Sequence, residues 1–250
     1  MFYEPGVTEH GLPHDPFKVR KSLVVDLLIP ADMDSRPVVP RPIGWISTKN
    51  KKGQCNLAPY SQFNNLTFDP PYVMFSSNQT ATGARKDTVV NAEETGTFVW
   101  NLATWDLREA VNISAEQTPY GTDEFELCNI TKEQATIVDV PMVKESPVKF
   151  ECEYHTTVRL PGNPPMGTVD IVIGKVIGVH IADEVLTDGL LDIKKTQPIA
   201  RCGYYQYTVV RDTFEMIIPN MSADVLYGLE GNAARNRQKN EENEESSSNQ

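Results

Sequence analysis

Six runs of β-branched and aromatic residues dominate the middle of the sequence, and they limit what the chain can fold into. Each run is bounded by Pro, Gly or Asn, as is typical of strands that end in turns. Strands in this number are typical of a barrel or a sandwich, so we predict a mostly β fold. The runs are RPIGWIST (41–48), PYVMFSS (71–77), TFVWNLA (97–103), VKFECEYHTTVRL (148–160), TVDIVIGKVIGVHI (168–181) and YYQYTVV (204–210).

The fourth run alternates between two sets of side chains. Successive residues of a strand point to opposite faces of a sheet, so each set occupies one face. We expect the more apolar face to pack on a core, and the other face to be wet or to lie at an interface. The first set is Phe150, Cys152, Tyr154, Thr156 and Val158, and the second is Glu151, Glu153, His155, Thr157 and Arg159.

Helical signal appears in only a few places. In KDTVVNAEETG, Asp87 or Thr88 is a suitable N-cap and Gly96 a suitable stop. In DLREAVNISAEQ, Asp106 with Glu109 three residues later forms a variant of the capping box. The sequence has no repeated strand–helix alternation and no GxGxxG motif, which disfavours a doubly wound nucleotide-binding sheet. We predict one α+β, mostly β domain built around an antiparallel barrel.

Charge and hydropathy exclude several classes of partner. The formal net charge is −11 and the 23 Lys and Arg residues are scattered, which disfavours nucleic acid. No segment approaches the roughly 20 apolar residues of a membrane span, and the N-terminal residues lack the apolar core of a signal peptide. We therefore expect a cytoplasmic protein without a membrane partner. The four cysteines form no CxxC pair, so we expect free thiols rather than a zinc site.

Composition changes at both ends of the chain. Residues 1–21 are rich in Pro, Gly and His, and we expect an arm that lies over the domain or stays mobile. His10 and His14 are separated by a proline, which disfavours the shared helical face that a metal pair would need. Residues 231–250 hold almost nothing to bury and should be disordered. The predicted folded domain is therefore residues 22–230.

The tripeptide KDT opens one of the predicted helices. The first N–H groups of a helix have no internal partner and form an anion site, which the helix dipole strengthens. Lys86 and Arg85 add cations there, and Thr88 can donate a hydroxyl, so a phosphate fits this position. For this tripeptide alone, an ordinary capped helix with solvated neighbours is the favoured interpretation.

The segment NLAPYSQFN offers hydrogen-bonding groups on a restrained backbone. Asn56, Tyr60 and Ser61 supply the polar side chains, and Pro59 holds the chain between them. Such a wall suits a flat heteroaromatic ligand. Taken alone, the segment could equally be a strand with a tight turn.

Taken together and in this order, five segments are more specific than each is alone. They are VPRPIGWIST, NLAPYSQFN, DPPYVMFSSN, RKDTVVNAEETGTFVWNL and PIARCGYYQY, and the resemblance that they carry covers roughly residues 38–210. This series resembles the flavin-reductase-like family with the FMN-binding split barrel, in its flavoredoxin-related branch. The resemblance implies a six-stranded antiparallel split barrel, a homodimer, and FMN bound near the subunit interface.

The resemblance also implies a set of cofactor-binding residues, which form the walls of an FMN pocket. Residues 46–48 would run beside the flavin ring, and the NLAPYS segment would contact the ring and the ribityl chain. Residues 85–88 would hold the phosphate. The full set is Ile46, Ser47, Thr48, Asn56, Ala58, Pro59, Tyr60, Ser61, Ser76, Arg85, Lys86, Asp87, Thr88 and Arg201.

Three further positions leave alternatives open. Arg201 and Gly203 fit an Arg-x-Gly-x-x-Tyr pattern near the ligand, but Cys202 replaces a commoner aliphatic residue. His180 either faces the ligand or ends a strand with its ring hydrogen-bonded, and the second alternative is favoured. His155 is expected in a surface or interface network.

No Ser-His-Asp order, paired carboxylates or metal cluster stands out, and no catalytic residue is assigned. This fits a flavoenzyme, in which the cofactor supplies the chemistry and the protein supplies orientation. We expect an oxidoreductase that passes hydride from NAD(P)H to FMN and then electrons to an unknown acceptor. The alternatives are a flavoredoxin-like FMN electron carrier without NAD(P)H activity, and a barrel that has lost its ligand and serves as an interaction module.

Overall fold

The computed structural model describes residues 38–80, 82–162, 167–203, 205–216 and 219. All helices and strands among them belong to a compact unit that ends at Arg211, and Asp212 begins a second unit. The predicted arm (1–21) and polar tail (231–250) lie outside the described residues, as do both ends of the predicted domain (22–230). These boundaries therefore stay predictions.

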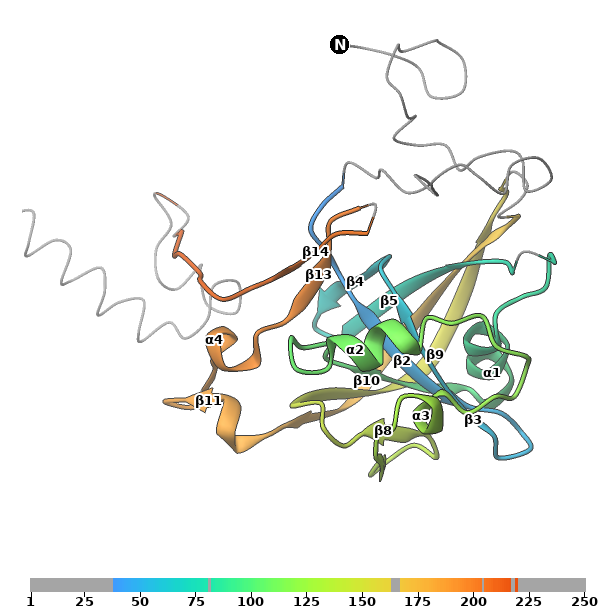
Figure 1. Cartoon of the computed structure of the whole chain (residues 1–250), viewed down its shortest axis with the longest axis horizontal. Coiled ribbons are helices and arrows are strands. Elements are labelled where there is room, and N and C mark those ends of the chain that lie inside the picture. Colours follow the sequence, from blue (N-terminus) through green and yellow to red (C-terminus); the bar gives the residue numbers. More distant parts are fainter. Residues whose placement is uncertain (1–37, 81, 163–166, 204, 217–218, 220–250) are drawn as a thin grey trace, which may run out of the picture. The chain divides into compact units, whose positions relative to one another are not determined.

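A sheet of seven antiparallel strands forms the centre of the first unit (Figure 1). Their order in the sheet is β3-β2-β6-β9-β10-β5-β4. The mostly β fold is thus confirmed, but the predicted count of six strands is wrong. Five of the six predicted runs contribute strands to this sheet, and the two edge strands β3 and β4 lie outside those runs. The sequence left β3 open as a strand with a tight turn, and the side chains of β4 are mostly exposed, so no core-facing pattern marks it. The strands are β2 (Gly44–Lys49), β3 (Cys55–Tyr60), β4 (Phe63–Phe68), β5 (Pro71–Asn78), β6 (Thr97–Asn101), β9 (Val148–Leu160) and β10 (Val169–Ile181).

The sheet is curled, because its two edge strands are neighbours in the chain. Only Ser61 and Gln62 separate the end of β3 from the start of β4. Arg41 Nε donates to the carbonyl oxygen of Ser61 at 3.1 Å. The backbone N–H of Ser76 donates to the carbonyl oxygen of Gln62 at 2.8 Å. Among the described residues no ladder joins β3 to β4, so the barrel is not closed.

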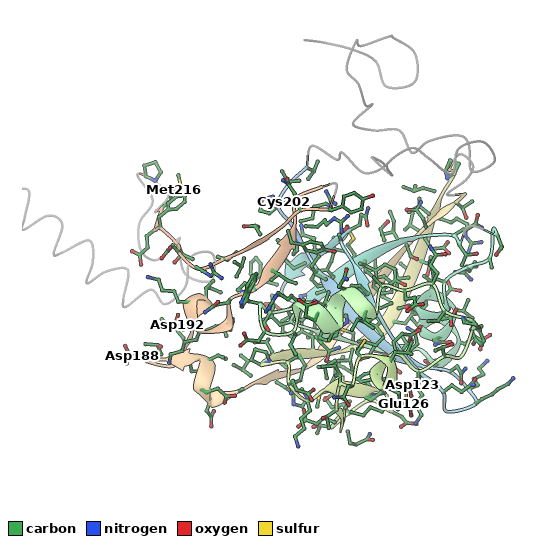
Figure 2. All side chains as sticks on the ribbon, in the orientation of Figure 1. Asp123, Glu126, Asp188, Asp192, Cys202 and Met216 are labelled. Atoms are coloured by element: carbon green, nitrogen blue, oxygen red, sulfur yellow. The ribbon has the colours of Figure 1, made fainter. Side chains whose placement is uncertain are left out.

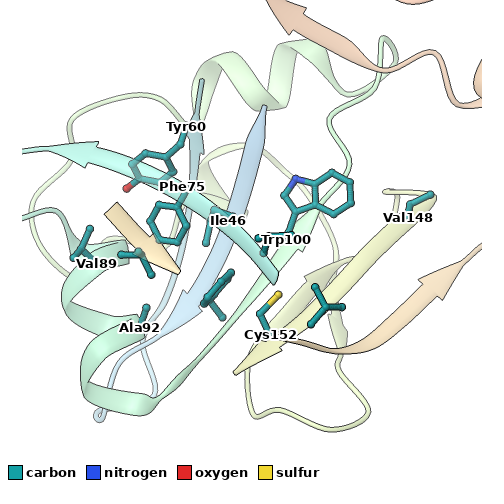
Figure 3. Packing of buried hydrophobic residues seen from close by; sticks show 12 residues of the cluster. Ile46, Tyr60, Phe75, Val89, Ala92, Trp100, Val148 and Cys152 are labelled. Atoms are coloured by element: carbon teal, nitrogen blue, oxygen red, sulfur yellow. The ribbon is translucent and has the colours of Figure 1, made fainter. Parts of the chain in front are cut away.

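One cluster of buried side chains fills the interior of the curled sheet (Figure 3). Ile46 and Phe75 are fully buried there, and Val89 and Ala92 join them from helix α1 (Asp87–Thr95). The ring of Trp100 lies 4.5 Å from that of Phe150 between centroids. Helix α1 therefore packs on the sheet through its apolar side and fixes the position of its own N-terminus.

The predicted helix caps differ from those observed. Helix α1 begins after Lys86, whose side chain has no acceptor with which to cap it. Asp87 is already the first residue of the helix, and its carboxylate accepts the Gly121 N–H at 3.2 Å. Helix α2 (Arg108–Ile113) also lacks a side-chain cap, so the predicted capping box is not formed. The predicted stop at Gly96 is confirmed, since its φ of 76° lies in the left-handed region that favours glycine.

A second cluster lies behind β2 and β3 and is covered by α2 and α3 (Glu124–Leu127). Trp45 is fully buried in it, and its indole N–H donates to Ser114 Oγ at 2.9 Å. Leu57 and Phe125 are also fully buried there. The start of β3 is thereby fixed on both sides, with α1 on one and α3 on the other.

The last predicted strand run forms part of a separate small sheet, with the order β1-β13-β14. Among the described residues 205–210 of that run, Tyr207–Val209 form a strand. Figure 2 labels Cys202, which directly follows β13, and all four cysteines are free thiols as predicted. The remaining elements are β1 (Arg41–Pro42), β7 (Lys132–Gln134), β8 (Pro141–Val143), η1 (Asp183–Val185), β11 (Leu186–Thr187), β12 (Leu190–Leu191), α4 (Ile193–Thr196), β13 (Ile199–Arg201) and β14 (Tyr207–Val209).

The polar face of β9 was expected to be wet or to lie at an interface, and one of its residues is neither. Its residue Glu151 is fully buried rather than wet, because the segment before β8 covers this end of the strand. The Glu151 carboxylate accepts the N–H groups of Thr136, Ile137 and Val138 at 2.7–3.0 Å. On the other face, Cys152 is buried in the interior as predicted.

Candidate ligand-binding site

A cavity of about 300 Å³ opens between β3, the start of α1 and the segment that follows α2. Both α1 and α3 pack against β3, which brings these elements together (Figure 1). Its walls carry mostly polar side chains. They comprise Asn56, Ala58, Pro59, Tyr60, Thr80, Thr82, Lys86, Asp87, Thr88, Ser114, Ala115, Glu116, Gln117, Thr118 and Glu124.

Strand β3 forms one wall, and its polar groups are held from behind. The amide nitrogen of Asn56 donates to Thr88 Oγ1 at 2.9 Å and to Thr48 Oγ1 at 3.4 Å. Pro59 is tolerated because β3 is an edge strand. Burial raises the pKa of Tyr60 to about 12, and hydrogen bonds with Thr88 and Ser77 oppose that shift. Tyr60 is therefore a neutral phenol at physiological pH.

Lys86 supplies the positive charge of the cavity. It is the N-cap residue of α1 and is half-buried. Within the described part of the chain, its ammonium group has no hydrogen-bond or ion-pair partner. Burial lowers the pKa of Lys86, and the charge of Asp87 opposes that effect. A cation beside the first N–H groups of a helix is suited to an anionic ligand.

Glu124, which the sequence did not single out, ties two walls of the cavity together. Its side chain is almost fully buried, at 4% exposure. One carboxylate oxygen accepts the N–H of Leu57 at 3.0 Å, and the other accepts the Thr118 hydroxyl at 2.8 Å. Burial raises the pKa of Glu124, and these two hydrogen bonds oppose the shift. Its sequence signal, an acidic residue in the first turn of a short helix, is too common to mark a site.

The structure brings half of the sequence-predicted site residues into this one cavity. The seven that line it come from the two contiguous segments of β3 and α1, and they are Asn56, Ala58, Pro59, Tyr60, Lys86, Asp87 and Thr88. The cavity walls do not include the other seven, which are Ile46, Ser47, Thr48, Ser61, Ser76, Arg85 and Arg201.

The residues predicted on β2 lie one layer behind the cavity. Ile46 is fully buried in the interior cluster. Ser47 points to the opposite face, where its hydroxyl donates to the Pro141 carbonyl at 2.7 Å. Thr48 accepts hydrogen bonds from Asn56 and Asn91, so it supports the cavity wall rather than forming it.

Arg85 is engaged in ion pairs away from the cavity. Its guanidinium group contacts the carboxylate of Glu93 at 2.5 Å and that of Asp170 at 2.9 Å. Asp170 also pairs with Arg159 at 2.6 Å. The second predicted cation is therefore part of a network that joins α1, β9 and β10, and Lys86 is the lysine or arginine that lines the cavity.

Four other predicted positions lie on the strands or in the link between two of them, outside the cavity walls. Ser61 belongs to the link between β3 and β4, and Ser76 lies on β5 with its N–H bonded to Gln62. Arg201 donates to the Tyr207 hydroxyl at 2.7 Å on the small sheet. His180 lies near the end of β10 with Nε2 2.6 Å from Glu151 Oε1, so its ring is hydrogen-bonded as favoured from the sequence.

The side chain of His155 is exposed, and its ring makes an edge contact with that of Tyr72, with 5.2 Å between centroids. The expected surface or interface network around His155 stays a prediction. Among the residues that the structure describes, no group of three or more His, Cys, Asp or Glu side chains could hold a metal ion. No helix of this part of the chain is both long and apolar enough to cross a membrane.

Residues 35–200 match the flavin reductase like domain, so the chain belongs to that family. An uncharacterised protein of Halalkalibacterium halodurans is 33% identical over 185 residues, which cover 74% of this chain and 88% of that protein. Nitrilotriacetate monooxygenase component B from Bacillus cereus is 32% identical, with a TM-score of 0.67 and coverage of 72% of this chain and 88% of that chain.

The flavoredoxin of Desulfovibrio vulgaris has a TM-score of 0.63 over 81% of this chain and 99% of that chain. Its sequence identity is 18%, so this likeness concerns the fold alone. A protein with a split barrel domain from Shewanella frigidimarina has a TM-score of 0.62 over 71% of this chain and 86% of that chain, and its 23% identity again limits the likeness to the fold. The match of residues 35–200 to the family model confirms the family resemblance predicted from the five sequence segments.

Proposed function

We propose that the chain binds FMN in the cavity between β3 and α1 and acts as an NAD(P)H-dependent flavin reductase. The observation that carries this proposal is the half-buried ammonium group of Lys86, which lines the cavity without a partner among the described residues. An unpaired, partly desolvated cation is costly unless a ligand supplies the opposite charge. The phosphate of FMN has that charge and suits a helix N-terminus.

The other walls of the cavity fit the rest of such a ligand. The β3 segment with Asn56, Pro59 and Tyr60 offers amide, hydroxyl and flat apolar surface to a ring and its polar chain. The cavity, at about 300 Å³, lies at the lower end of the range of about 300–1,000 Å³ for ligand pockets. This size supports a homodimer in which the partner subunit completes the wall over the ring.

When bound, FMN would supply the redox chemistry by accepting hydride from a reduced nicotinamide. In this proposal, Lys86 and the α1 N-terminus bind the phosphate, while β3 orients the ring and excludes water from one side. Glu124 holds β3 and the segment after α2 at a fixed separation. Because Tyr60 stays protonated, it can donate a hydrogen bond without adding negative charge beside the ligand.

The phosphate assignment is tested by titration of the apoprotein with FMN and with riboflavin, which lacks the phosphate. Lys86→Ala removes a charge-assisted contact worth about 1.5–3 kcal/mol, so FMN affinity should fall about 10- to 100-fold. Riboflavin affinity should change far less. The exposed Lys52→Ala is the matched control and should leave both affinities unchanged. Equal weakening toward both flavins would refute the assignment, because it would indicate general damage to the cavity.

Anaerobic mixing of the FMN-loaded protein with NADH and with NADPH tests the enzymatic part of the proposal. Rapid bleaching of the flavin absorbance by either nicotinamide is the expected result. A protein that binds FMN but is reduced by neither would instead be an electron carrier. A negative result with both nicotinamides would leave the flavin-binding result standing, since flavin binding does not require nicotinamide activity.

A further inference from the structure

A second cavity of about 470 Å³ lies between α2 and the strands β13 and β14. It shares no residue with the cavity beside β3. Its lining includes Trp105, Arg108, Val111, Tyr205, Tyr207 and Val209. The predicted chemistry of the flavin site makes no use of this groove.

Aromatic rings are unusually open to solvent in this groove. Trp105 is 38% exposed, Tyr207 43% and Tyr205 70%. The two other tryptophans of the chain, Trp45 and Trp100, are 0% and 8% exposed. Aromatic surface gains more from burial than most side chains do, so exposed rings gathered in one concave place are typical of a binding site.

Guanidinium groups lie over these rings. The Cζ atom of Arg108 is 4.2 Å from the centroid of the Trp105 ring, and that of Arg211 is 5.0 Å from the same centroid. On β14, the Tyr207 ring has the Arg201 Cζ 4.7 Å from its centroid. Of these, Arg108 lines the groove, and a guanidinium group placed over an aromatic ring can still present N–H groups as a planar fork to a carboxylate.

The one acidic side chain of the groove does not neutralise this fork. Glu109 Oε1 is 3.6 Å from Arg108 Nε, and the Glu109 side chain is 78% exposed. An exposed ion pair of this length contributes little and exchanges readily with a ligand. Arg108 Nη1 also donates to the Trp105 carbonyl at 2.7 Å, which fixes the guanidinium group beside the indole. Glu109 disfavours a dianion here, so a ligand with a single negative charge fits best.

We propose that this groove binds a small planar aromatic carboxylate, with its ring against Trp105 and Tyr207 and its carboxylate on Arg108. Aromatic edge and face contacts would hold the ring, and two parallel N–H···O bonds would hold the carboxylate. The apolar side chains of Val111 and Val209 complete the walls. This site is separate from the proposed flavin site and does not depend on it.

Trp105 provides the readout, because it is the one substantially exposed tryptophan of the three in the chain. The full-length protein is titrated with benzoate, with benzyl alcohol and with cyclohexanecarboxylate, while tryptophan emission is followed. Benzoate should quench the emission with saturation. The neutral alcohol and the non-aromatic acid should each bind at least about 10-fold more weakly, because each lacks one of the two contacts.

Two variants and a control separate a site from unspecific binding. Arg108→Gln should weaken the affinity for benzoate about 10-fold or more. Trp105→Phe removes the fluorescent readout, so its benzoate binding is measured by ligand-detected NMR. This variant should still bind benzoate, because an aromatic ring remains. Lys52→Gln should change nothing. Equal responses to all three compounds, unchanged affinity in Arg108→Gln, or displacement of benzoate by FMN would overturn the proposal. No saturable response in the wild type would also overturn it.

Discussion

At the scale of single residues, Glu151 joins the sheet to the segment before β8. Its two carboxylate oxygens accept three backbone N–H groups, and Oε1 also lies 2.6 Å from His180 Nε2. Burial would raise the pKa of Glu151, but the hydrogen bonds with His180 and the backbone outweigh it, so the pKa lies below its ordinary value of 4.5. The ionised form is therefore the one that stabilises the fold.

Glu151→Gln should lower the free energy of unfolding by about 1–3 kcal/mol at neutral pH, because an amide N–H₂ would face backbone donors. The contribution of the carboxylate is present above the ordinary pKa of 4.5 and is lost as the pH falls through the lower folded value. The difference between wild type and variant should hence shrink below about pH 4.5. Urea denaturation across this range measures it.

Glu153→Gln is the matched control, since Glu153 lies on the same strand and is exposed. It should cost little at any pH in the range. A stability difference for Glu151→Gln that stays constant from neutral to acidic pH would contradict the role of the ionised carboxylate.

At the scale of elements, β10 depends on a glycine that lets β6 approach. A Cβ atom built on Gly174 would lie 2.4 Å from two ring atoms of Phe98 and 3.2 Å from the Glu153 carbonyl oxygen. Phe98 is fully buried, so its ring has nowhere to move without displacing the interior cluster. The register of β9 against β10 also shifts between Ile173 and Gly174.

Gly174→Ala should therefore destabilise the protein by about 1–3 kcal/mol through overpacking. Thermal unfolding followed by circular dichroism measures this, with the exposed neighbour Lys175→Ala as the control. Equal midpoints for the two variants would mean that the backbone absorbs the methyl group without strain.

The elements that the sequence predicted are those with a core-facing pattern. β2, β5, β6, β9 and β10 alternate or run apolar, and each is a strand. β3 was left open as a strand with a tight turn, and β4 carries no core-facing pattern because every side chain after Phe63 is exposed. The YYQYTVV run joins the small sheet because of a tertiary pairing with β13.

The site residues that could be predicted are likewise those that lie close together in the sequence. The residues of β3 and α1 that line the cavity are contiguous in the sequence, so two short segments suffice to nominate them. Glu124 and Thr118 enter the cavity only because α3 packs against β3. The burial of Glu151 likewise depends on a segment 13 to 15 residues away, which alternation within β9 could not reveal.

At the scale of the whole molecule, we expect the proposed homodimer in solution. Light scattering should give about twice the chain mass of 28.0 kDa. A monomer that retains flavin at working concentration would contradict a partner subunit that completes the pocket. A monomer that has also lost its flavin would agree with the proposal, in which flavin binding depends on the dimer.

Deletion of residues 235–250 should leave both flavin content and the unfolding midpoint unchanged. That stretch contains no aliphatic or aromatic residue, so its composition offers no apolar surface to bury. Thermal unfolding and absorbance of the truncated protein measure the effect. Loss of several degrees in the midpoint would show that these residues contribute to the fold.

The two-residue link of Ser61 and Gln62 also bears on how the chain folds. Because the strands at opposite ends of the sheet are tethered this closely, they meet at a high effective concentration as soon as the hairpins β2–β3 and β4–β5 have formed. The short link between β3 and β4 thereby forces the sheet to curve. Flexible residues inserted between Ser61 and Gln62 would leave every ladder intact yet slow refolding, since a longer loop raises the entropic cost of closure.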